Sequence, residues 1–153
     1  MTTPYWLQDA IFYQIFPDRF SNGDQANDPI NVEKWGSAPT ISGFQGGDLR
    51  GIIHRFDYLL DLGINAIYLN PIFLSPANHR YHTSDYYKID PRLGGMLDFH
   101  ALVDLAHRNN VRIILDGVFN HCSRGFFAFN DLLENNPHSS YKDWFYVRRF
   151  PLD

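Results

Sequence analysis

The stretch DLRGIIHRFDYLLDLGINAIYLNP, from Asp48 to Pro71, decides the fold. Its first part places apolar residues at helical spacing, which predicts a helix over Asp48–Leu62. Asp48 can cap the start of this helix, and Gly63 can end it in the left-handed conformation. The run that begins at Ala66 is β-branched, aromatic and almost continuously apolar, which is typical of a strand buried on both faces of a parallel sheet.

Two similar runs and a second helical pattern surround this stretch. AIFYQIF (Ala10–Phe16) and the run VRIILDGVF from Val111 predict strands, and the pattern from Asp98 predicts a helix that ends at Asn109 or Asn110 in place of a glycine. The order strand, helix, strand, helix, strand indicates an α/β fold with right-handed crossovers. The long loops follow the strands, and α/β barrels and doubly wound sheets place their functional sites at those strand ends.

Composition narrows the class of protein. The 153 residues suit one domain with a core, and a net charge of −4 argues against a nucleic-acid partner. The N-terminal sequence MTTPYWLQDA is no secretory signal, and the chain has no stretch long enough to span a membrane. A single cysteine fits a reducing compartment, so a cytoplasmic protein is expected. A dinucleotide-binding sheet is disfavoured because PDRFSNGD lacks the glycine-rich turn after the first strand.

The first polar cluster lies in the loop after the first predicted strand. Asn22, Asp24, Asn27 and Asp28 bring hard oxygen donors together, which suits Ca²⁺. An EF-hand is excluded because Ala26 and Asn27 occupy its fifth and sixth positions. From the residues alone, a calcium site and a plain Asx-turn loop both remain open.

The second and third clusters follow the other two strands. NHRYHTSDYY (Asn78–Tyr87) is either an ordered surface loop or a platform on which tyrosine stacks and histidine donates a hydrogen bond. In LDGVFNHCSRG (Leu115–Gly125), Asp116 ends a strand close to His121, as an acid–base pair or as a structural hydrogen bond. The spacing around His121 excludes a zinc site, and Cys122 reads as a small packed residue.

Together these segments resemble the α-amylase superfamily of glycoside hydrolases, in its cyclomaltodextrinase, neopullulanase and maltogenic amylase branch. The resemblance rests on YQIFPDRFSNGD, on GGDLRGIIHRFDYLLDLGINAIYLNPIF, on NHRYHTSDYYKIDPRLGG and on DGVFNH. That family folds as a (β/α)₈ TIM barrel with a small domain inserted after strand three. The resemblance therefore implies that residues 1–122 form the first three strands and two helices of the barrel. Residues 123–153, which include SSYKDWFYV, would begin the inserted domain B.

The resemblance also implies roles for single residues. His79 and Tyr81 of the H-x-Y element would contact the sugar at the cleavage subsite, with Tyr81 as the stacking platform. Asp116 and His121 would bind hydroxyl groups of the same sugar. His82 stands where many members of the branch have Asp, which leaves the exact substrate open.

A calcium ion is implied as well, in the loop after the first strand. Its ligands would be Asn22, Asp24, Asn27, Asp28, the carbonyl group of Gly46 and the carboxylate of Asp48. This assignment favours the calcium interpretation of the first polar cluster and gives Asp48 a second use besides helix capping.

The implied chemistry is retaining hydrolysis, in which a carboxylate nucleophile and a carboxylic acid flank the glycosidic bond. The family places these carboxyl groups after later strands than the three predicted here. The sequence is therefore expected to be the N-terminal part of an α-glucan hydrolase that acts on α-1,4 and, more widely, α-1,6 bonds. Alone it is expected to be inactive, with the missing part of the barrel as a partner. The alternative is a non-catalytic maltooligosaccharide-binding or barrel-completing remnant.

Overall fold

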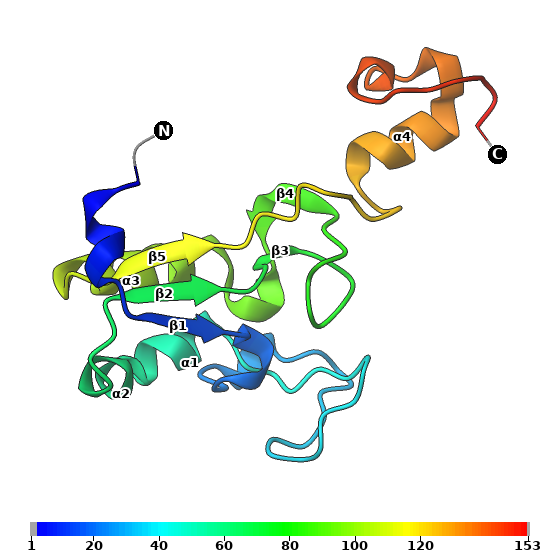
Figure 1. Cartoon of the computed structure of the whole chain (residues 1–153). Coiled ribbons are helices and arrows are strands. Elements are labelled where there is room, and N and C mark those ends of the chain that lie inside the picture. Colours follow the sequence, from blue (N-terminus) through cyan, green and yellow to red (C-terminus); the bar gives the residue numbers. More distant parts are fainter. Residues whose placement is uncertain (1–2, 153) are drawn as a thin grey trace.

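A three-stranded parallel sheet organises the molecule. The computed structural model describes residues 3–152, and its main sheet has the order β1 (Phe12–Ile15), β2 (Ala66–Leu69), β5 (Arg112–Leu115), as Figure 1 shows. All three strands lie inside the predicted runs, which confirms them. The register aligns Gln14 with Tyr68 and Tyr68 with Ile114, so neighbouring strands end at the same edge.

The helix predicted over Asp48–Leu62 is present but interrupted. It consists of α1 (Leu49–His54) and α2 (Phe56–Asp61), separated at Arg55, whose φ of −102° and ψ of 13° leave the helical region. The predicted ends are confirmed. The Asp48 side chain accepts a hydrogen bond from the Gly51 N–H at 2.6 Å, and Gly63 has a φ of 74°.

The second helix begins earlier than predicted. α3 spans Gly95–Arg108, and Gly94 precedes it in the left-handed conformation with a φ of 99°. At its other end, Asn110 rather than Asn109 takes the left-handed position, with a φ of 57°. The glycine pair at 94 and 95 hides the start of the helix from a pattern search, because glycine has a low helix propensity.

The helices cover one face of the sheet, and side-chain alternation decides which residues meet them. The core on that face contains the buried residues Ile15, Ile67, Leu69, Leu49, Ile52, Leu59 and Leu102. The alternate residues face the opposite side. There the short 3-10 helix η1 (Tyr5–Asp9) places Trp6 against Phe12 and Arg112, and Phe12 remains 47% exposed.

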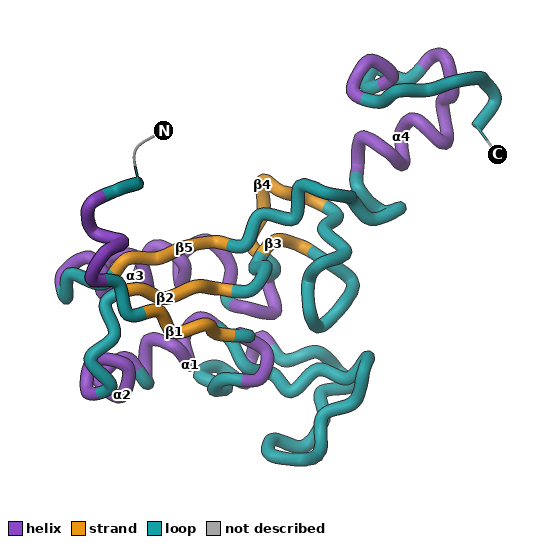
Figure 2. The backbone as a smooth tube through the Cα atoms, viewed as in Figure 1, coloured by secondary structure: helices purple, strands orange, loops and turns teal. Residues whose placement is uncertain are grey.

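The loop after β2 contains an unpredicted hairpin. β3 (Phe73–Leu74) pairs antiparallel with β4 (Asp85–Ile89), where the sequence predicted only a long connection from Asn70 to Gly95. β3 is two residues long, too short to leave a period-two pattern. Figure 2 shows that this loop and the loop after β1 gather at the carboxyl ends of the strands.

The last part of the described chain projects away from the sheet in Figure 1. It comprises α4 (Phe127–Asn135) and two short turns, and the rings of Phe127, Tyr141 and Trp144 pack edge to face within it. The predicted division between residues 122 and 123 falls in the loop just before α4. Among residues 3–152, no helix has the length and apolar character needed to cross a membrane.

Candidate functional site

The strand register brings one set of side chains to the face of the sheet opposite α1, α2 and α3. Gln14 and Tyr68 are paired neighbours on that face, and Asp116 follows Ile114 at the next equivalent position beyond β5. The backbone N–H of Asp116 still bonds to the Leu69 carbonyl at 3.0 Å, which fixes the carboxylate at the end of the strand. An open cleft of about 360 Å³ lies here, lined by Phe12, Gln14, Tyr68, Tyr81 and Asp116.

Tyr81 reaches this cleft from the loop after β2. Its hydroxyl donates a hydrogen bond to Asp116 Oδ2 at 2.7 Å. This hydrogen bond, together with partial burial and the charge of Asp116, raises the pKa of Tyr81 to about 12. The phenol is therefore neutral at physiological pH and remains a donor to Asp116. The Tyr68 phenol also lies close enough to the Asp116 carboxylate for a hydrogen bond, and the carboxylate lines the cleft, where it can accept from a ligand donor.

His79 packs against Tyr81, with ring centroids 5.9 Å apart. Its Nδ1 accepts the Tyr81 backbone N–H at 3.1 Å, so the proton of the neutral ring is on Nε2. Burial lowers the pKa of His79, and the neighbouring His82 and Arg80 lower it further. Near neutral pH the ring is thus an uncharged donor through Nε2.

His121 is tied to the same segment. Its Nε2 lies 3.1 Å from the Tyr81 carbonyl oxygen, which can only accept, so Nε2 carries the proton. Its Nδ1 lies 3.3 Å from Nδ2 of Asn120, which donates to it. The structure therefore brings His79, Tyr81, Asp116 and His121 together, and both ring nitrogens of His121 are engaged by the protein.

One tyrosine at this site, Tyr68, was missed from the sequence, and another, Tyr86, was predicted only as a member of the segment Asn78–Tyr87. Tyr68 borders the cleft, where burial and the nearby Asp116 charge raise its pKa. Counting alternate residues along the second strand would have found Tyr68. The Tyr86 hydroxyl contacts the carbonyl oxygens of Val118 and His121, at 2.5 Å and 3.1 Å, and so ties β4 to the segment that carries His121. No sequence signal indicates that contact.

The predicted calcium loop gathers around Asp48. Its carboxylate accepts the backbone N–H of Gly23 at 3.0 Å and of Asp24 at 2.9 Å, and the side-chain amide of Asn27 at 3.0 Å. The Asn22 amide donates to both oxygens of Asp28, at 2.9 and 3.0 Å.

Two side-chain oxygen atoms of this loop lack a hydrogen-bond partner within the described chain. Oδ1 of Asn22 and Oδ1 of Asn27 are buried without a hydrogen-bond partner. Gly46, with a φ of 83°, lies so close that an added Cβ would come 2.5 Å from Asp28 Oδ1. The carboxylate of Asp24 pairs instead with Arg50, at 3.3 Å. Within residues 3–152, no group of at least three His, Cys, Asp or Glu side chains is arranged to hold a metal ion, so carbonyl oxygens would have to contribute.

Comparison with known proteins identifies the family. The model of the alpha amylase catalytic domain matches residues 14–151. The chain belongs to the alpha-amylase family. The predicted resemblance is thereby confirmed, and with it the assignment of the sheet and helices to part of a (β/α)₈ barrel.

Individual relatives agree with this assignment. The cyclomaltodextrinase of Thermoanaerobacter pseudethanolicus is 54% identical over 149 residues, which is 97% of this chain and 26% of that protein. Neopullulanase 2 of Thermoactinomyces vulgaris is 51% identical, over 99% of this chain and 26% of that protein. The cyclic alpha-maltosyl-(1→6)-maltose hydrolase of Arthrobacter globiformis, in complex with its named sugar, superimposes with a TM-score of 0.93 at 52% identity, over 100% of this chain and 35% of that one. The chain thus spans about a quarter of the length of these curated relatives.

Proposed function

We propose that this chain supplies part of the substrate site of a glycoside hydrolase that acts on α-glucans. The observation that carries the proposal is the hydrogen bond from Tyr81 to Asp116, which joins the H-x-Y segment to the DGVFNH segment at the end of β5. A stacking ring and an ionisable acceptor then line one cleft, and a neutral imidazole packs against that ring. That combination suits a sugar, which offers an apolar ring face and a rim of hydroxyl groups.

Each side chain has a distinct task in this proposal. The Tyr81 ring packs against the face of the sugar, while its hydroxyl stays bonded to Asp116 Oδ2. His79 donates through Nε2, and Asp116 accepts a sugar hydroxyl through Oδ1. His121 joins the set only if its Nε2–H exchanges the Tyr81 carbonyl for a sugar hydroxyl, because both of its nitrogens are engaged in the free chain.

Bond cleavage is assigned to groups outside this chain. Retaining hydrolysis needs two carboxyl groups about 5 Å apart across the glycosidic bond. Asp116 is the only acid among the described residues that line the cleft, and it is already bonded to Tyr81. We therefore expect no hydrolysis by this chain alone. Its partner would be the polypeptide that completes the barrel, acting on maltooligosaccharides and on α-1,4 and α-1,6 bonds.

The test of the sugar site is a titration of the purified chain with maltotriose, followed by NMR or calorimetry. We expect the native chain to bind maltotriose, Tyr81→Ala to abolish this binding and Tyr146→Ala to preserve it. Tyr146 is the control because it is fully exposed and far from Tyr81 in the sequence. Equal binding by all three proteins would contradict it. The same samples, incubated with cyclodextrin, maltotriose and pullulan, should release no reducing sugar. Hydrolysis by the chain alone would show that the cleaving groups are present after all.

A non-catalytic glucan-binding module is the second candidate function. It is favoured by the same observation, because the Tyr81–Asp116 pair needs no residue outside this chain. The two functions separate when the chain is mixed with a polypeptide that carries the later strands of a relative's barrel. Restored hydrolysis supports the enzyme part, and sugar binding with no hydrolysis in any mixture supports the module.

We also propose that the loop after β1 binds Ca²⁺. The support is the pair of buried side-chain oxygens, Oδ1 of Asn22 and Oδ1 of Asn27, which accept no hydrogen bond from the described residues. The nitrogen atoms of the same two amides donate to the carboxylates of Asp28 and Asp48. Hard oxygen atoms of this kind are calcium ligands. The ligand set would be Asn22, Asp24, Asn27, Asp28, the Gly46 carbonyl and Asp48. When bound, the ion would supply positive charge that fixes the loop, with no part in bond cleavage.

Equilibrium dialysis of the chelator-treated chain tests this assignment directly. We expect Ca²⁺ to bind with higher affinity than Mg²⁺, because Mg²⁺ demands a stricter octahedral geometry. Asn22→Ala and Asn27→Ala should each weaken binding, while Asn130→Ala, on the exposed face of α4, should not. Absence of Ca²⁺ binding at millimolar concentrations would refute the proposal.

We further propose that residues 123–153 begin a separate inserted domain. The support is that α4 and the turns after it pack largely on one another and project from the sheet in Figure 1. Limited proteolysis should then cut first between Cys122 and Phe127, and resistance of that loop would oppose the division.

A further inference from the structure

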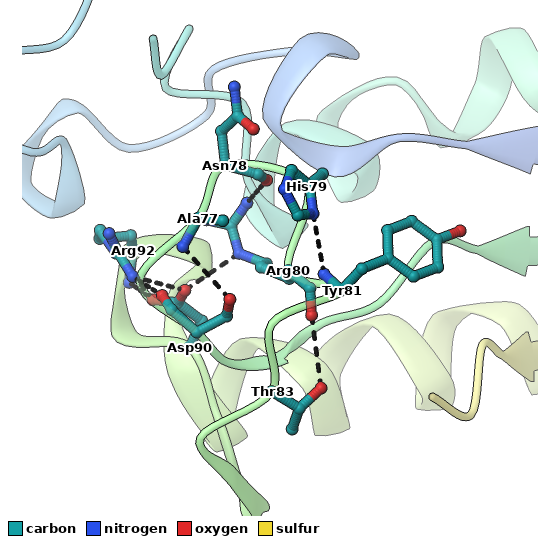
Figure 3. A network of polar contacts seen from close by, with 9 residues as sticks. Ala77, Asn78, His79, Arg80, Tyr81, Thr83, Asp90 and Arg92 are labelled. Carbon is teal, nitrogen blue, oxygen red and sulfur yellow. Dashed lines mark hydrogen bonds and ion pairs between the residues drawn. The ribbon is translucent and has the colours of Figure 1, made fainter. Parts of the chain in front are cut away.

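A buried ionic cluster lies beneath the segment that carries His79 and Tyr81. Arg80, between them, is 1% exposed, and its partner Asp90 is fully buried. The guanidinium contacts Asp90 Oδ2 through Nε at 3.0 Å and donates from Nη1 to the Asn78 carbonyl at 2.6 Å, as Figure 3 shows. The Arg80 guanidinium is therefore turned inward, away from the residues that line the cleft.

The backbone at Arg80 explains this inward direction. Its φ of 59° lies in the left-handed region, which few residues other than glycine adopt. Figure 3 shows the Arg80 side chain reaching toward Asp90 while the Tyr81 ring points the opposite way. Thr83 adds a hydrogen bond from its hydroxyl to the Arg80 carbonyl at 3.3 Å. The turn thus sends one side chain into the protein and its neighbour into the cleft.

Each charged member of the cluster has several partners. Arg92 forms a two-pronged contact with Asp90, with Nε to Oδ1 and Nη2 to Oδ2 both at 3.0 Å. Burial lowers the pKa of Arg80, while the charges of Asp90 and of the buried Asp18 favour its charged form. The Phe44 ring lies against both guanidinium groups, 5.8 Å from Arg80 and 4.7 Å from Arg92.

The cluster also connects the two long loops. Asn78, whose carbonyl accepts from Arg80, donates through its side-chain amide to the carbonyl oxygens of Ile41 at 3.1 Å and Gly43 at 2.7 Å. Both of those residues belong to the loop after β1. Displacement of the guanidinium would therefore release Asn78 as well as the turn at Arg80.

We propose that Arg80 is a positioning residue: anchored on Asp90 and the Asn78 carbonyl, it sets the left-handed turn that places His79 and Tyr81 against Asp116. The part that concerns sugar rests on the function proposed above, whereas the part that concerns the Tyr81–Asp116 contact does not. Arg80 does not touch the sugar. It acts through the two side chains next to it in sequence.

Two substitutions separate the side chain from the backbone. Arg80→Asn removes the guanidinium and keeps a residue that tolerates the left-handed conformation. Arg80→Lys keeps the charge but not the fork that bonds Asp90 and a carbonyl together. Arg108→Asn, at the exposed end of α3, is the matched control for the loss of a positive charge. Circular dichroism establishes that each variant is folded.

The first readout is ionisation of Tyr81, observed by NMR of ring-labelled tyrosine and assigned with Tyr81→Phe. At about pH 11 the native phenol should be mostly protonated, because the pKa of Tyr81 is about 12. In Arg80→Asn it should be mostly ionised, with its pKa near the ordinary value of about 10, and Arg80→Lys should fall between. Arg108→Asn should match the native chain. A folded Arg80→Asn chain with unchanged Tyr81 ionisation overturns the proposal, because Arg80 would then be only structural.

The second readout is maltotriose affinity. We expect at least a tenfold loss in Arg80→Asn, with partial recovery in Arg80→Lys. If the native chain binds no sugar but Tyr81 ionisation still responds to Arg80, the proposed function fails and the positioning role stands. If Arg80→Asn does not fold, Arg80→Lys and Asp90→Asn decide. Altered Tyr81 ionisation in both folded variants supports the proposal, and unchanged ionisation in either overturns it.

Discussion

The two long loops at the carboxyl ends of the strands are ordered in different ways. In the loop after β2, Arg80 and Arg92 both form ion pairs with the buried Asp90. The loop after β1 leaves the buried carbonyl oxygens of Asn22 and Asn27 without a donor. A buried polar group is destabilising unless it is paired. The difference teaches that the arginines of the loop after β2 find their partners within the chain, whereas the unpartnered oxygens of the loop after β1 are where we propose that a cation binds.

The largest expected effect comes from removal of the shared anion of the loop after β2. Asp90→Ala would leave two guanidinium groups without their carboxylate, and breaking a buried ion pair in this way costs about 3–5 kcal/mol. Urea denaturation of the native and variant chains measures the loss. Asp61→Ala, at the exposed end of α2, is the control and should change stability by less than about 0.5 kcal/mol. If Asp90→Ala lost no more than this control, the loop after β2 would not depend on its internal charges.

Addition of Ca²⁺ tests the opposite loop. An ion that binds only the folded state adds about 2.7 kcal/mol of stability when its concentration is 100 times the dissociation constant. We expect this gain in the native chain and its loss in the double variant Asn22→Ala, Asn27→Ala, as measured by urea denaturation with Ca²⁺ or with chelator. Arg92→Lys, in the other loop, should respond to Ca²⁺ as the native chain does. A calcium gain that survives the double variant would place the ion elsewhere.

A pair of glycines measures how closely the loop after β1 is packed around this proposed ion. Gly46 and Gly36 have similar φ values of 83° and 80°, but a Cβ at Gly46 would crowd Asp28 and Asn22, whereas a Cβ at Gly36 would meet nothing within 4 Å. Alanine at either position carries the strain of the left-handed region, about 1–2 kcal/mol. Gly46→Ala should therefore lose more stability than Gly36→Ala and should alone weaken Ca²⁺ binding. Equal losses in thermal denaturation would show an open loop.

Much of the scaffold could be predicted from sequence, because apolar strands and amphipathic helices follow local patterns. The strands around Ile15, Leu69 and Ile113 and the caps at Asp48 and Gly63 were found in this way. The site residues came from the resemblance. The geometry of the site could not be predicted, because the contact between Tyr81 and Asp116 joins residues 35 positions apart and depends on a left-handed turn at Arg80. Likewise, the partner of Arg80 is set by tertiary packing, and no period in the sequence points from Arg80 to Asp90.

The smallest expected effect concerns the point where the loop after β2 meets the sheet. The pKa of Tyr81 in the folded chain, about 12, is above its unfolded value of about 10. The protonated phenol therefore stabilises the fold fully below pH 10, and this contribution disappears as pH rises from 10 through 12. Tyr81→Phe should lose about 1 kcal/mol at neutral pH and show a flatter alkaline decline in the free energy of unfolding. The exposed Tyr146→Phe should follow the native curve. The loop after β1 has no tyrosine contact of this kind among its described hydrogen bonds. Added Ca²⁺ should therefore raise the free energy of unfolding of the native chain and of Tyr81→Phe without changing the alkaline slope of either curve. A changed slope would mean that the two loops are coupled through Asn78.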